Sequence, residues 1–410
     1  MSGVGKSWEL YEQACRVIPM GTQTHSKAPR EALRDVEPCF LVRGKGCRVW
    51  DMDGNEYIDF RNGLGPVSLG YGFDAVDEAV KAQIDNGYVF SYAHPLEAQV
   101  ASRLVDIIPC AEKVRFLKSG GEAMSATHRL ARGFTGRDII VSCGYHGWMN
   151  TVTGKGTPKA IGSAYRQLPW GDMTPYEDLF RELGDDIAAV SVSCDYRDMD
   201  KGHEFLPALR TLTQKHGALL IFDEIVTGFR LARAGAQEFF DVTPDLSVFA
   251  KGMSNGVPLS CYCGRADVMD VVKDVVISST FGGDTLGLAA CNAVLDVYEN
   301  EPVVDTLWAR GHQLHTGFNA ICAELEMPAW FWGMPPLGML AFSHEEAAKN
   351  AELFLRFNGE VLKRGVIIYS VCYPNYSHSE ADIDMALEAM REALGVVKDG
   401  LSDHGRTQKK

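Results

Sequence analysis

The chain has 410 residues, of which 46% are hydrophobic and 23% charged, as is typical of a globular protein with one large domain or two to three smaller ones. Its formal net charge of -14 argues against nucleic acid or an anionic membrane as the main partner, because both require a basic surface. Small molecules are the expected partners, and no apolar run is long enough to predict a membrane span.

The N-terminal sequence and the spacing of the cysteines indicate in which cellular compartment the protein works. Charged residues stand where the apolar core of a signal peptide would lie, so nothing there predicts export. Of the 11 cysteines only Cys261 and Cys263 are close together, and their spacing fits neither a zinc site nor a small disulfide scaffold. We therefore expect a cytoplasmic protein without a metal site.

In chain order, the first predicted element is a hairpin over 44–60, where Asp53-Gly54 separates two alternating runs. Six short apolar runs follow, each separated from the next by amphipathic or turn-rich sequence. They are predicted strands, at 114–117, 138–143, 187–193, 218–222, 246–250 and 259–264. This alternation predicts an α/β fold with a mostly parallel sheet.

The rest of the chain predicts a second, smaller domain. Residues 291–322 are strongly helical in pattern, and the region from about 330 returns to strands before an amphipathic helix that ends near 397. We expect four parts: an N-terminal segment, a large central α/β domain, a C-terminal small domain that completes the N-terminal segment, and a mobile tail. Their predicted bounds are 1–60, 61–295, 296–397 and 398–410.

Polar or glycine residues follow three of the predicted strands. Asp223 directly follows one strand, Lys251 follows the next, and Ser119, Gly120 and Gly121 lie between a strand and a helix. In open α/β sheets ligands bind at the carboxyl ends of the strands, so these residues are expected to share one edge. The free N–H groups that open the helix suit a phosphate.

A lysine, a carboxylate and a phosphate cradle together fit pyridoxal 5'-phosphate (PLP), which binds a lysine, keeps its ring nitrogen protonated through a carboxylate and is anchored by its phosphate. Each feature alone has a structural alternative. A glycine-rich turn is common, a lysine after a strand is usually solvated, and an aspartate there often caps a helix. The joint pattern favours the cofactor site.

Five motifs in this order resemble the class III aminotransferases of fold type I, and within them the glutamate-1-semialdehyde aminomutase subgroup. The motifs are "SGGEA" (119–123), "GYHGW" (144–148), "FDEIVTGFR" (222–230), "FAKGM" (249–253) and "TFGG" (280–283). The resemblance implies a fold type I PLP-dependent transferase: a large domain with a seven-stranded, mostly parallel sheet and a smaller α+β domain from the N- and C-terminal segments.

The resemblance also implies roles around the ring of PLP. Lys251 would be the Schiff-base lysine, which must be neutral to move the substrate α-proton, and Asp223 the partner of the pyridinium nitrogen. Tyr145 resembles the aromatic residue that stacks on one face of the ring. Ile225, two residues after Asp223 and expected on the same face of a strand, would form the apolar wall on the other.

Further residues are implied to bind the cofactor. Ser119, Gly120 and Gly121 match the phosphate loop, although the subgroup usually has threonine where Gly121 stands. His146 lies within a cofactor motif and is interpreted as a structural hydrogen-bonding residue. Thr280 matches the residue that reaches the phosphate from the neighbouring subunit, which implies a homodimer with shared active sites.

The segments that would recognise substrate depart from the aminomutase. The aminomutase binds the carboxylate of its substrate with a Ser and an Arg. Ser26 and Arg30 resemble this pair but stand one residue further apart, and Arg61 and Lys27 are further candidates for binding a substrate carboxylate or phosphate. We therefore expect an aminotransferase, biosynthetic in role, that moves an amino group between a small amino acid or amine and a carbonyl acceptor. An aminomutase or epimerase on the same scaffold is the alternative, and a non-catalytic PLP-fold binding protein is disfavoured by Lys251 and Asp223.

Overall fold

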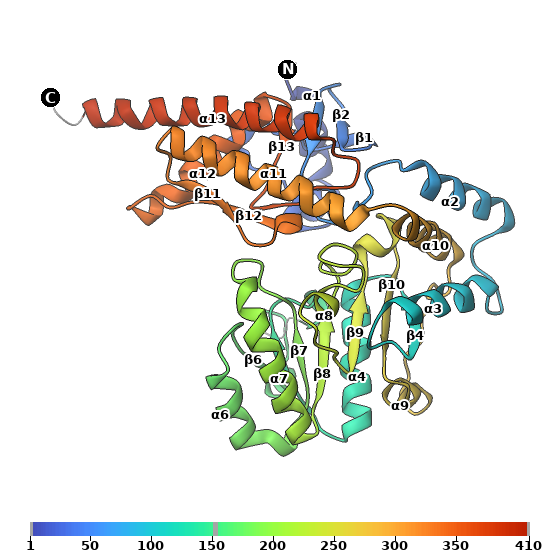
Figure 1. Cartoon of the computed structure of the whole chain (residues 1–410). Coiled ribbons are helices and arrows are strands. Elements are labelled where there is room, and N and C mark those ends of the chain that lie inside the picture. The colour runs from blue at the N-terminus through green and yellow to red at the C-terminus, as the bar shows by residue number, and fades with distance from the viewer. Residues whose placement is uncertain (1–2, 151–154, 408–410) are drawn as a thin grey trace. The chain divides into compact units, whose positions relative to one another are not determined.

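The computed structural model describes residues 3–150 and 155–407 (Figure 1). The chain divides into two compact units. The first consists of Met1–Leu64, Leu69–Phe73 and Asp305–Lys410, and the second of Gly65–Ser68 and Asp74–Val304. None of the helices in the described part is both long enough and apolar enough to cross a membrane.

A seven-stranded sheet is the centre of the second unit. Its strands, in spatial order, are β4 (Lys113–Leu117), β10 (Ser260–Gly264), β9 (Leu246–Phe249), β8 (Leu219–Asp223), β7 (Ile187–Val192), β5 (Ile139–Cys143) and β6 (Tyr165–Gln167). Strand β10 runs antiparallel to both of its neighbours, and the pairings among the other strands are parallel. The mostly parallel sheet and the six predicted strands are confirmed; β6 escaped prediction because it is short and polar.

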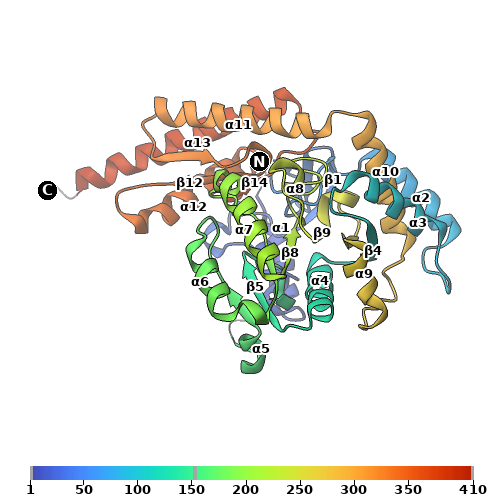
Figure 2. The same ribbon diagram turned by 60° about the horizontal axis from the view of Figure 1, so that its bottom comes forward.

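Helices cover both faces of this sheet. The helices of this unit are α2 (Asp74–Asn86), α3 (Pro95–Ile107), α4 (Gly120–Thr135), α5 (Lys159–Ser163), α6 (Thr174–Leu183), α7 (Gly202–His216), α8 (Ala236–Phe239), α9 (Ala266–Met269) and α10 (Thr285–Asn300). The crossover through α4 runs from β4 to β5, whereas that through α7 runs from β7 to β8 in the opposite direction across the sheet. Because such crossovers are right-handed, α4 and α7 lie on opposite faces, as Figures 1 and 2 show.

The central strands are apolar because both of their faces are covered. Every residue of β5, β7, β8, β9 and β10 is buried, so these strands appear in the sequence as continuous apolar runs without alternation. Leu130 and Ala131 of α4 pack with Ile140, Ile221 and Val248 in one core cluster. This core fixes where the strands end. It therefore also fixes the positions of the residues that directly follow the strands.

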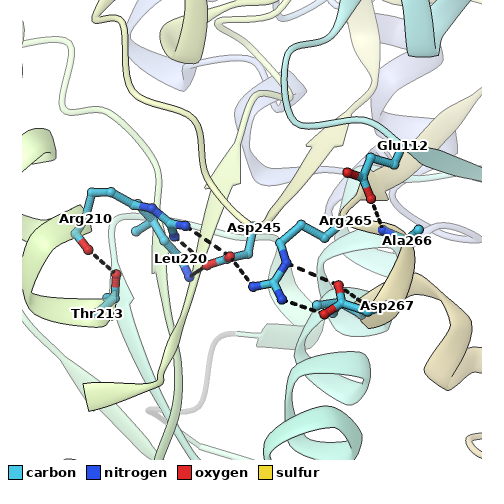
Figure 3. A network of polar contacts seen from close by, with 9 residues as sticks. Glu112, Arg210, Thr213, Leu220, Asp245, Arg265, Ala266 and Asp267 are labelled. Carbon is cyan, nitrogen blue, oxygen red and sulfur yellow. Dashed lines mark hydrogen bonds and ion pairs between the residues drawn. The ribbon is translucent and has the colours of Figure 1, made fainter. Parts of the chain in front are cut away.

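A buried carboxylate ties together the end of the sheet at which β8 and β9 begin (Figure 3). Asp245, just before β9, accepts hydrogen bonds from Arg210 Nη1 at 2.5 Å, from Arg265 Nη1 at 2.8 Å and from the backbone N–H of Leu220 at 2.8 Å. Burial alone would raise the pKa of Asp245, but these donors hold it below its ordinary value. Asp245 therefore ties α7, β8 and the segment after β10 together, and its role is structural.

The first unit contains two small sheets and long helices. Its sheets have the orders β1-β2-β3-β13 and β11-β12-β14. Its elements are α1 (Gly5–Ala14), β1 (Leu41–Lys45), β2 (Arg48–Asp51), β3 (Glu56–Asp59), α11 (Val303–Glu324, which begins in the second unit), β11 (Ala329–Trp332), β12 (Gly338–Phe342), α12 (Ala347–Lys363), β13 (Val366–Ile367), β14 (Val371–Cys372) and α13 (Glu380–Thr407). The hairpin predicted around Asp53-Gly54 is β2–β3, and Gly54 has the positive φ of 89° that its turn requires.

Two expectations about chain boundaries differ from the structure. The units divide after Leu64 and Val304 rather than at 60 and 295, because α10 continues to Asn300. Helix α13 continues as far as Thr407, so it includes most of the tail predicted to begin at residue 398, and the mobility of that tail stays a prediction. Residues 408–410 lie outside the described residues.

Candidate active site

Four segments of the second unit end at the same edge of the sheet. Asp223 is the last residue of β8, and Lys251 comes two residues after β9 ends. Helix α4 starts three residues after β4, and Tyr145 comes two residues after β5. These strands are parallel to one another, so their carboxyl ends meet at one edge, where α/β proteins bind ligands.

Asp223 is paired with a histidine at this edge. Its side chain is buried, and Oδ2 accepts a hydrogen bond from His146 Nδ1–H at 2.8 Å. The other carboxylate oxygen accepts the backbone N–H of Ile225 at 3.1 Å. His146 is itself buried, and its Nε2 has no hydrogen-bond partner among the described residues. The two donors fix the orientation of the Asp223 carboxylate.

A second histidine packs behind the first. The ring of His128, in α4, lies edge-on to that of His146 with 6.4 Å between centroids. Its Nε2 is hydrogen-bonded to Ser191 Oγ at 2.7 Å, and its Nδ1 lies 3.4 Å from Tyr165 Oη. Burial, together with the charges of His146 and Arg132, lowers the pKa of His128 well below its ordinary value. A neutral His128 therefore supports the His146–Asp223 pair without adding a charge.

The N-terminus of α4 is closed by a capping box. Ser119 Oγ accepts the backbone N–H of Glu122 at 3.4 Å, and the Glu122 carboxylate accepts the backbone N–H of Ser119 at 2.8 Å. Ser119 O also accepts a hydrogen bond from Ser260 Oγ of β10 at 2.9 Å. The capping box leaves the N–H groups of Gly120 and Gly121, in the first turn, directed out of the helix.

The loop after β5 lies against this helix start. A Cβ atom at Gly147 would come within 2.8 Å of Gly121 Cα, so only glycine allows the approach. Asn150 Nδ2 donates to Gly121 O at 3.1 Å and to His146 O at 2.8 Å. The loop that carries Tyr145 and His146 is therefore joined to the N-terminal end of α4.

Two side chains provide apolar surface. Ile225 is half-buried, and a Cβ at Gly120 would lie 2.8 Å from its Cγ1. The expectation that Ile225 continues the strand after Asp223 is wrong, since β8 ends at Asp223 and Ile225 lies in the following turn. Tyr145 is 69% exposed and so leaves a free aromatic face.

Lys251 occupies an unusual position. It has a φ of 48°, a left-handed backbone conformation that costs a non-glycine residue about 1 kcal/mol or more. Burial lowers the pKa of its ammonium from 10.5 to about 8, with Arg230 also lowering it and Asp223 opposing the shift. Arg230 is fully buried, and its Nη2 donates to Gly65 O at 2.9 Å. With this pKa, about a tenth of Lys251 is uncharged at pH 7.

Thr280 is not joined to these groups. It is exposed, and its side chain makes no hydrogen bond with the described residues. Its turn rests on β4, because a Cβ at Gly282 would lie 2.8 Å from Phe116 O. In the single chain the side chain of Thr280 is therefore exposed to solvent.

The substrate candidates lie in the first unit, in different environments. Arg30 is engaged: its Nη2 donates to Glu37 at 2.7 Å and to Asn358 Oδ1 at 3.0 Å. Ser26 is exposed and Lys27 is exposed beside a cavity, which Arg61 also lines. The expected pair of Ser26 and Arg30 is therefore not presented as a joint carboxylate site.

Comparison with known proteins identifies the family. Residues 31–394 match the model of the class-III aminotransferases, so the chain belongs to this family. It is 32% identical to the 3-aminobutyryl-CoA aminotransferase of Cloacimonas acidaminovorans, over 96% of this chain and 98% of that protein. It is 34% identical to the glutamate-1-semialdehyde 2,1-aminomutase of Syntrophobacter fumaroxidans, over 95% of this chain and 97% of that protein.

Solved structures agree with this assignment. The FumI protein of Sphingopyxis sp. MTA144, solved with PLP, superposes with a TM-score of 0.90 at 27% identity, over 97% of this chain and 98% of that one. An omega-transaminase from Sphaerobacter thermophilus gives 0.88 at 25% identity, over 96% and 98%. The expected family, the fold type I architecture and a PLP-dependent enzyme of the aminotransferase class are thereby confirmed.

Several residues that build the site escaped sequence reasoning. His128, Asn150 and Ser191 lie inside ordinary helix, loop and strand sequence, and nothing local distinguishes them. Gly147 carried a signal, because a second glycine close after Gly144 suggests a backbone that must approach another segment.

Proposed function

We propose that the second unit binds PLP and that the protein transfers an amino group from a small amino acid or amine to a carbonyl acceptor. The observation that carries this proposal is the buried Asp223–His146 pair, 2.8 Å apart, at the sheet edge that also presents Lys251. A carboxylate held in place, a lysine with a lowered pKa and a helix N-terminus fit the ring nitrogen, the aldehyde and the phosphate of PLP.

When bound, PLP supplies a cationic ring that withdraws electrons from the α-carbon of the substrate. Asp223 would hold the proton on the ring nitrogen. His146 would hold this carboxylate in the correct orientation, because its Nδ1–H donates to Oδ2. Lys251 would hold the cofactor covalently. Its neutral Nζ would take the proton from the α-carbon of the amino donor and, with the acceptor bound, would supply a proton to the carbonyl carbon that becomes the new α-carbon.

The remaining residues would position the cofactor. The N–H groups of Gly120 and Gly121 would bind the phosphate, since a helix N-terminus combines free donors with a positive dipole end. Ile225 would pack on one face of the ring, and Tyr145 would stack on the other. Tyr145 is exposed in the single chain and would lose this exposure on binding PLP.

The assignment of Lys251 is tested by trapping the cofactor. Purified protein should absorb near the visible edge, and borohydride followed by proteolysis and mass spectrometry should find PLP on Lys251. Lys118 is an internal control, since it lies in the turn before α4 and its Nζ is paired with Asp284 at 2.7 Å. An adduct on Lys118, or on any lysine except Lys251, would contradict the proposal.

Two variants separate binding from chemistry. Lys251→Ala should fold and hold PLP non-covalently while losing turnover, because the helix N-terminus and Asp223 remain. Asp223→Asn should lower turnover by about 100-fold or more with a smaller effect on cofactor retention, because it removes the charge and keeps the shape. Normal turnover in Asp223→Asn would make Asp223 a structural residue only.

The aminomutase is the second candidate, because a relative of this name is 34% identical over nearly the whole chain. The environment of Arg30 supports the aminotransferase, since its guanidinium is already paired with Glu37. An aminomutase returns the amino group to the same carbon skeleton and needs no acceptor. Turnover of a single amino-aldehyde or amino-ketone without any carbonyl acceptor would therefore reject the aminotransferase.

We propose further that two chains share their active sites. Phe281, next to Thr280, is exposed, as are Tyr88 and Phe90. These segments are neighbours, because the backbone N–H of Thr285 donates to Tyr88 O at 3.0 Å. An exposed apolar surface beside Thr280 supports a homodimer in which Thr280 reaches the phosphate bound by the other subunit.

Mixed dimers test this sharing. Chains with Lys251→Ala are combined with chains that carry Thr280→Val, so that one site of each heterodimer regains both intact groups. Activity above that of either parent is expected. Proven heterodimers without any recovery would place Thr280 outside the shared site.

We also expect the protein to work in the cytoplasm. All 11 cysteines are free thiols and nine of them are buried, as suits a reducing compartment. Fractionation of cells that express the tagged chain would test this expectation.

A further inference from the structure

A cavity of about 400 Å³ lies within the first unit. The segment before β1, the loop after β3, α12 and β13 all contribute to its walls. Its volume is within the range of small-molecule binding sites. Five charged side chains line it: Lys27, Arg30, Arg61, Glu37 and Asp59.

Both carboxylates of the cavity are already satisfied by the protein. Glu37 accepts hydrogen bonds from the backbone N–H of Arg30 at 2.7 Å and from its Nη2 at 2.7 Å. Asp59 accepts from Tyr71 Oη at 2.7 Å and from the backbone N–H of Arg61 at 2.7 Å. The cavity therefore has no carboxylate that needs a cationic ligand.

Arg61 is in the opposite situation. Its guanidinium makes no hydrogen bond or ion pair with the part of the chain that the structure describes, and its Nε is buried without a partner. The group lies over the ring of Tyr369, 4.7 Å from the centroid, which fixes its plane. Burial lowers the pKa of Arg61 from its ordinary value, with Tyr369, Glu37 and Asp59 opposing the shift. A held guanidinium with free donors is a binding group for a planar anion.

The rest of the cavity wall indicates which chemical groups such an anion would carry besides its charge. Phe40, Leu362, Ile367 and Ile368 line the same cavity and present apolar surface. We propose that this cavity binds an organic carboxylate with an apolar body, whose carboxylate pairs with Arg61. The ligand has two possible sources, the reacting amino or keto acid or a separate carboxylate effector, and both share this chemistry.

Calorimetric titration of the PLP-loaded wild-type protein tests the site with 3-phenylpropanoate and with its neutral analogue 3-phenylpropan-1-ol. Neither compound has an amino group, so neither can react with the cofactor. The acid should bind at least tenfold more tightly than the alcohol, since only the acid pairs with Arg61. Equal affinities, or no binding of the acid at millimolar concentration, would overturn the proposal without the use of any variant.

Variants assign the effect to one side chain. Arg61→Met should weaken binding of the acid by about 10- to 100-fold and leave binding of the alcohol unchanged. Arg61→Lys keeps the charge but loses the planar fork, so it should fall between the two and should fold even if Arg61→Met does not. Arg43→Met is the matched control: Arg43 also lies over an aromatic ring, Trp50, at 4.3 Å, but it is exposed and outside the cavity. Loss of binding in Arg43→Met equal to that in Arg61→Met, or unchanged binding in Arg61→Lys and Arg61→Met, would overturn the proposal.

Kinetics then distinguish the two sources. If the carboxylate belongs to the reacting molecule, 3-phenylpropanoate should raise the apparent KM of an amino acid donor competitively in wild type and not in Arg61→Met. If it belongs to an effector, the acid should bind without competition. The titration itself requires no turnover, so it stands even if trapping fails to find PLP on Lys251.

Discussion

The lowered pKa of Lys251 makes a prediction for the protein freed of its cofactor. A drop from 10.5 to about 8 corresponds to about 3 kcal/mol against the charged form. At pH 8 about half of Lys251 should be neutral, compared with roughly 1 in 300 for an ordinary lysine. Because Asp223 attracts the ammonium and raises this pKa, Asp223→Asn should move the midpoint further below 8.

Trace acetylation followed by mass spectrometry measures this titration. The apoprotein is labelled with acetic anhydride at a series of pH values, and the reactivity of each lysine is followed. Lys201 is the control, since hydrogen bonding to Asp198 raises its pKa and its reactivity should still be climbing where that of Lys251 has levelled off. A Lys251 midpoint near that of Lys201, or an upward shift in Asp223→Asn, would refute the reasoning.

The same shift has a consequence for stability, with a definite sign. The unfolded chain binds the proton on Lys251 more tightly than the folded chain, so between about pH 8 and 10.5 the unfolded state carries more protons. The free energy of unfolding of the apoprotein should therefore rise with pH across this window, by up to about 3 kcal/mol relative to Lys251→Met. Parallel pH profiles for the two proteins would contradict the buried environment of Lys251.

Three further predictions concern the scaffold of the site. In a denaturant titration, Gly235→Ala should destabilise the protein by about 2–4 kcal/mol, because φ is 75° and the new Cβ would lie 2.7 Å from the Glu224 carboxyl carbon and 2.9 Å from Gly228 N. The control Gly136→Ala, where φ is 68° and the new Cβ would meet no other atom, should cost only about 1 kcal/mol. Gly121→Ala should be tolerated, since its Cβ would meet Met149 Cε at 3.5 Å, and should gain about 0.5–1 kcal/mol of helix stability; a clear loss would show that the start of α4 is tighter than this distance implies. Ser119→Ala removes the capping box and should cost about 1 kcal/mol in thermal unfolding of the apoprotein, whereas an unchanged midpoint would mean that Glu122 alone closes the helix.

Local sequence determined the strands and the ends of the strands. The runs around Ile140, Ile221 and Val248 are apolar without alternation, which is what a sheet covered on both faces requires, and Asp223 and Lys251 mark where two of these runs stop. Because hydrophobic pattern and turn residues act over a few positions, they can be interpreted without the fold. The motif order then led to the family that the comparison confirmed.

Tertiary structure alone decided which side chains are paired. His146 and Asp223 are 77 residues apart, and Arg30 and Asn358 are 328 apart, so no local pattern could indicate that one histidine orients the carboxylate or that Arg30 is already engaged. The same holds for Arg61, whose free guanidinium depends on where Glu37 and Asp59 find their own donors. Local sequence fixes secondary structure, but the charge that remains available to a ligand is decided by long-range hydrogen bonds formed when the chain folds.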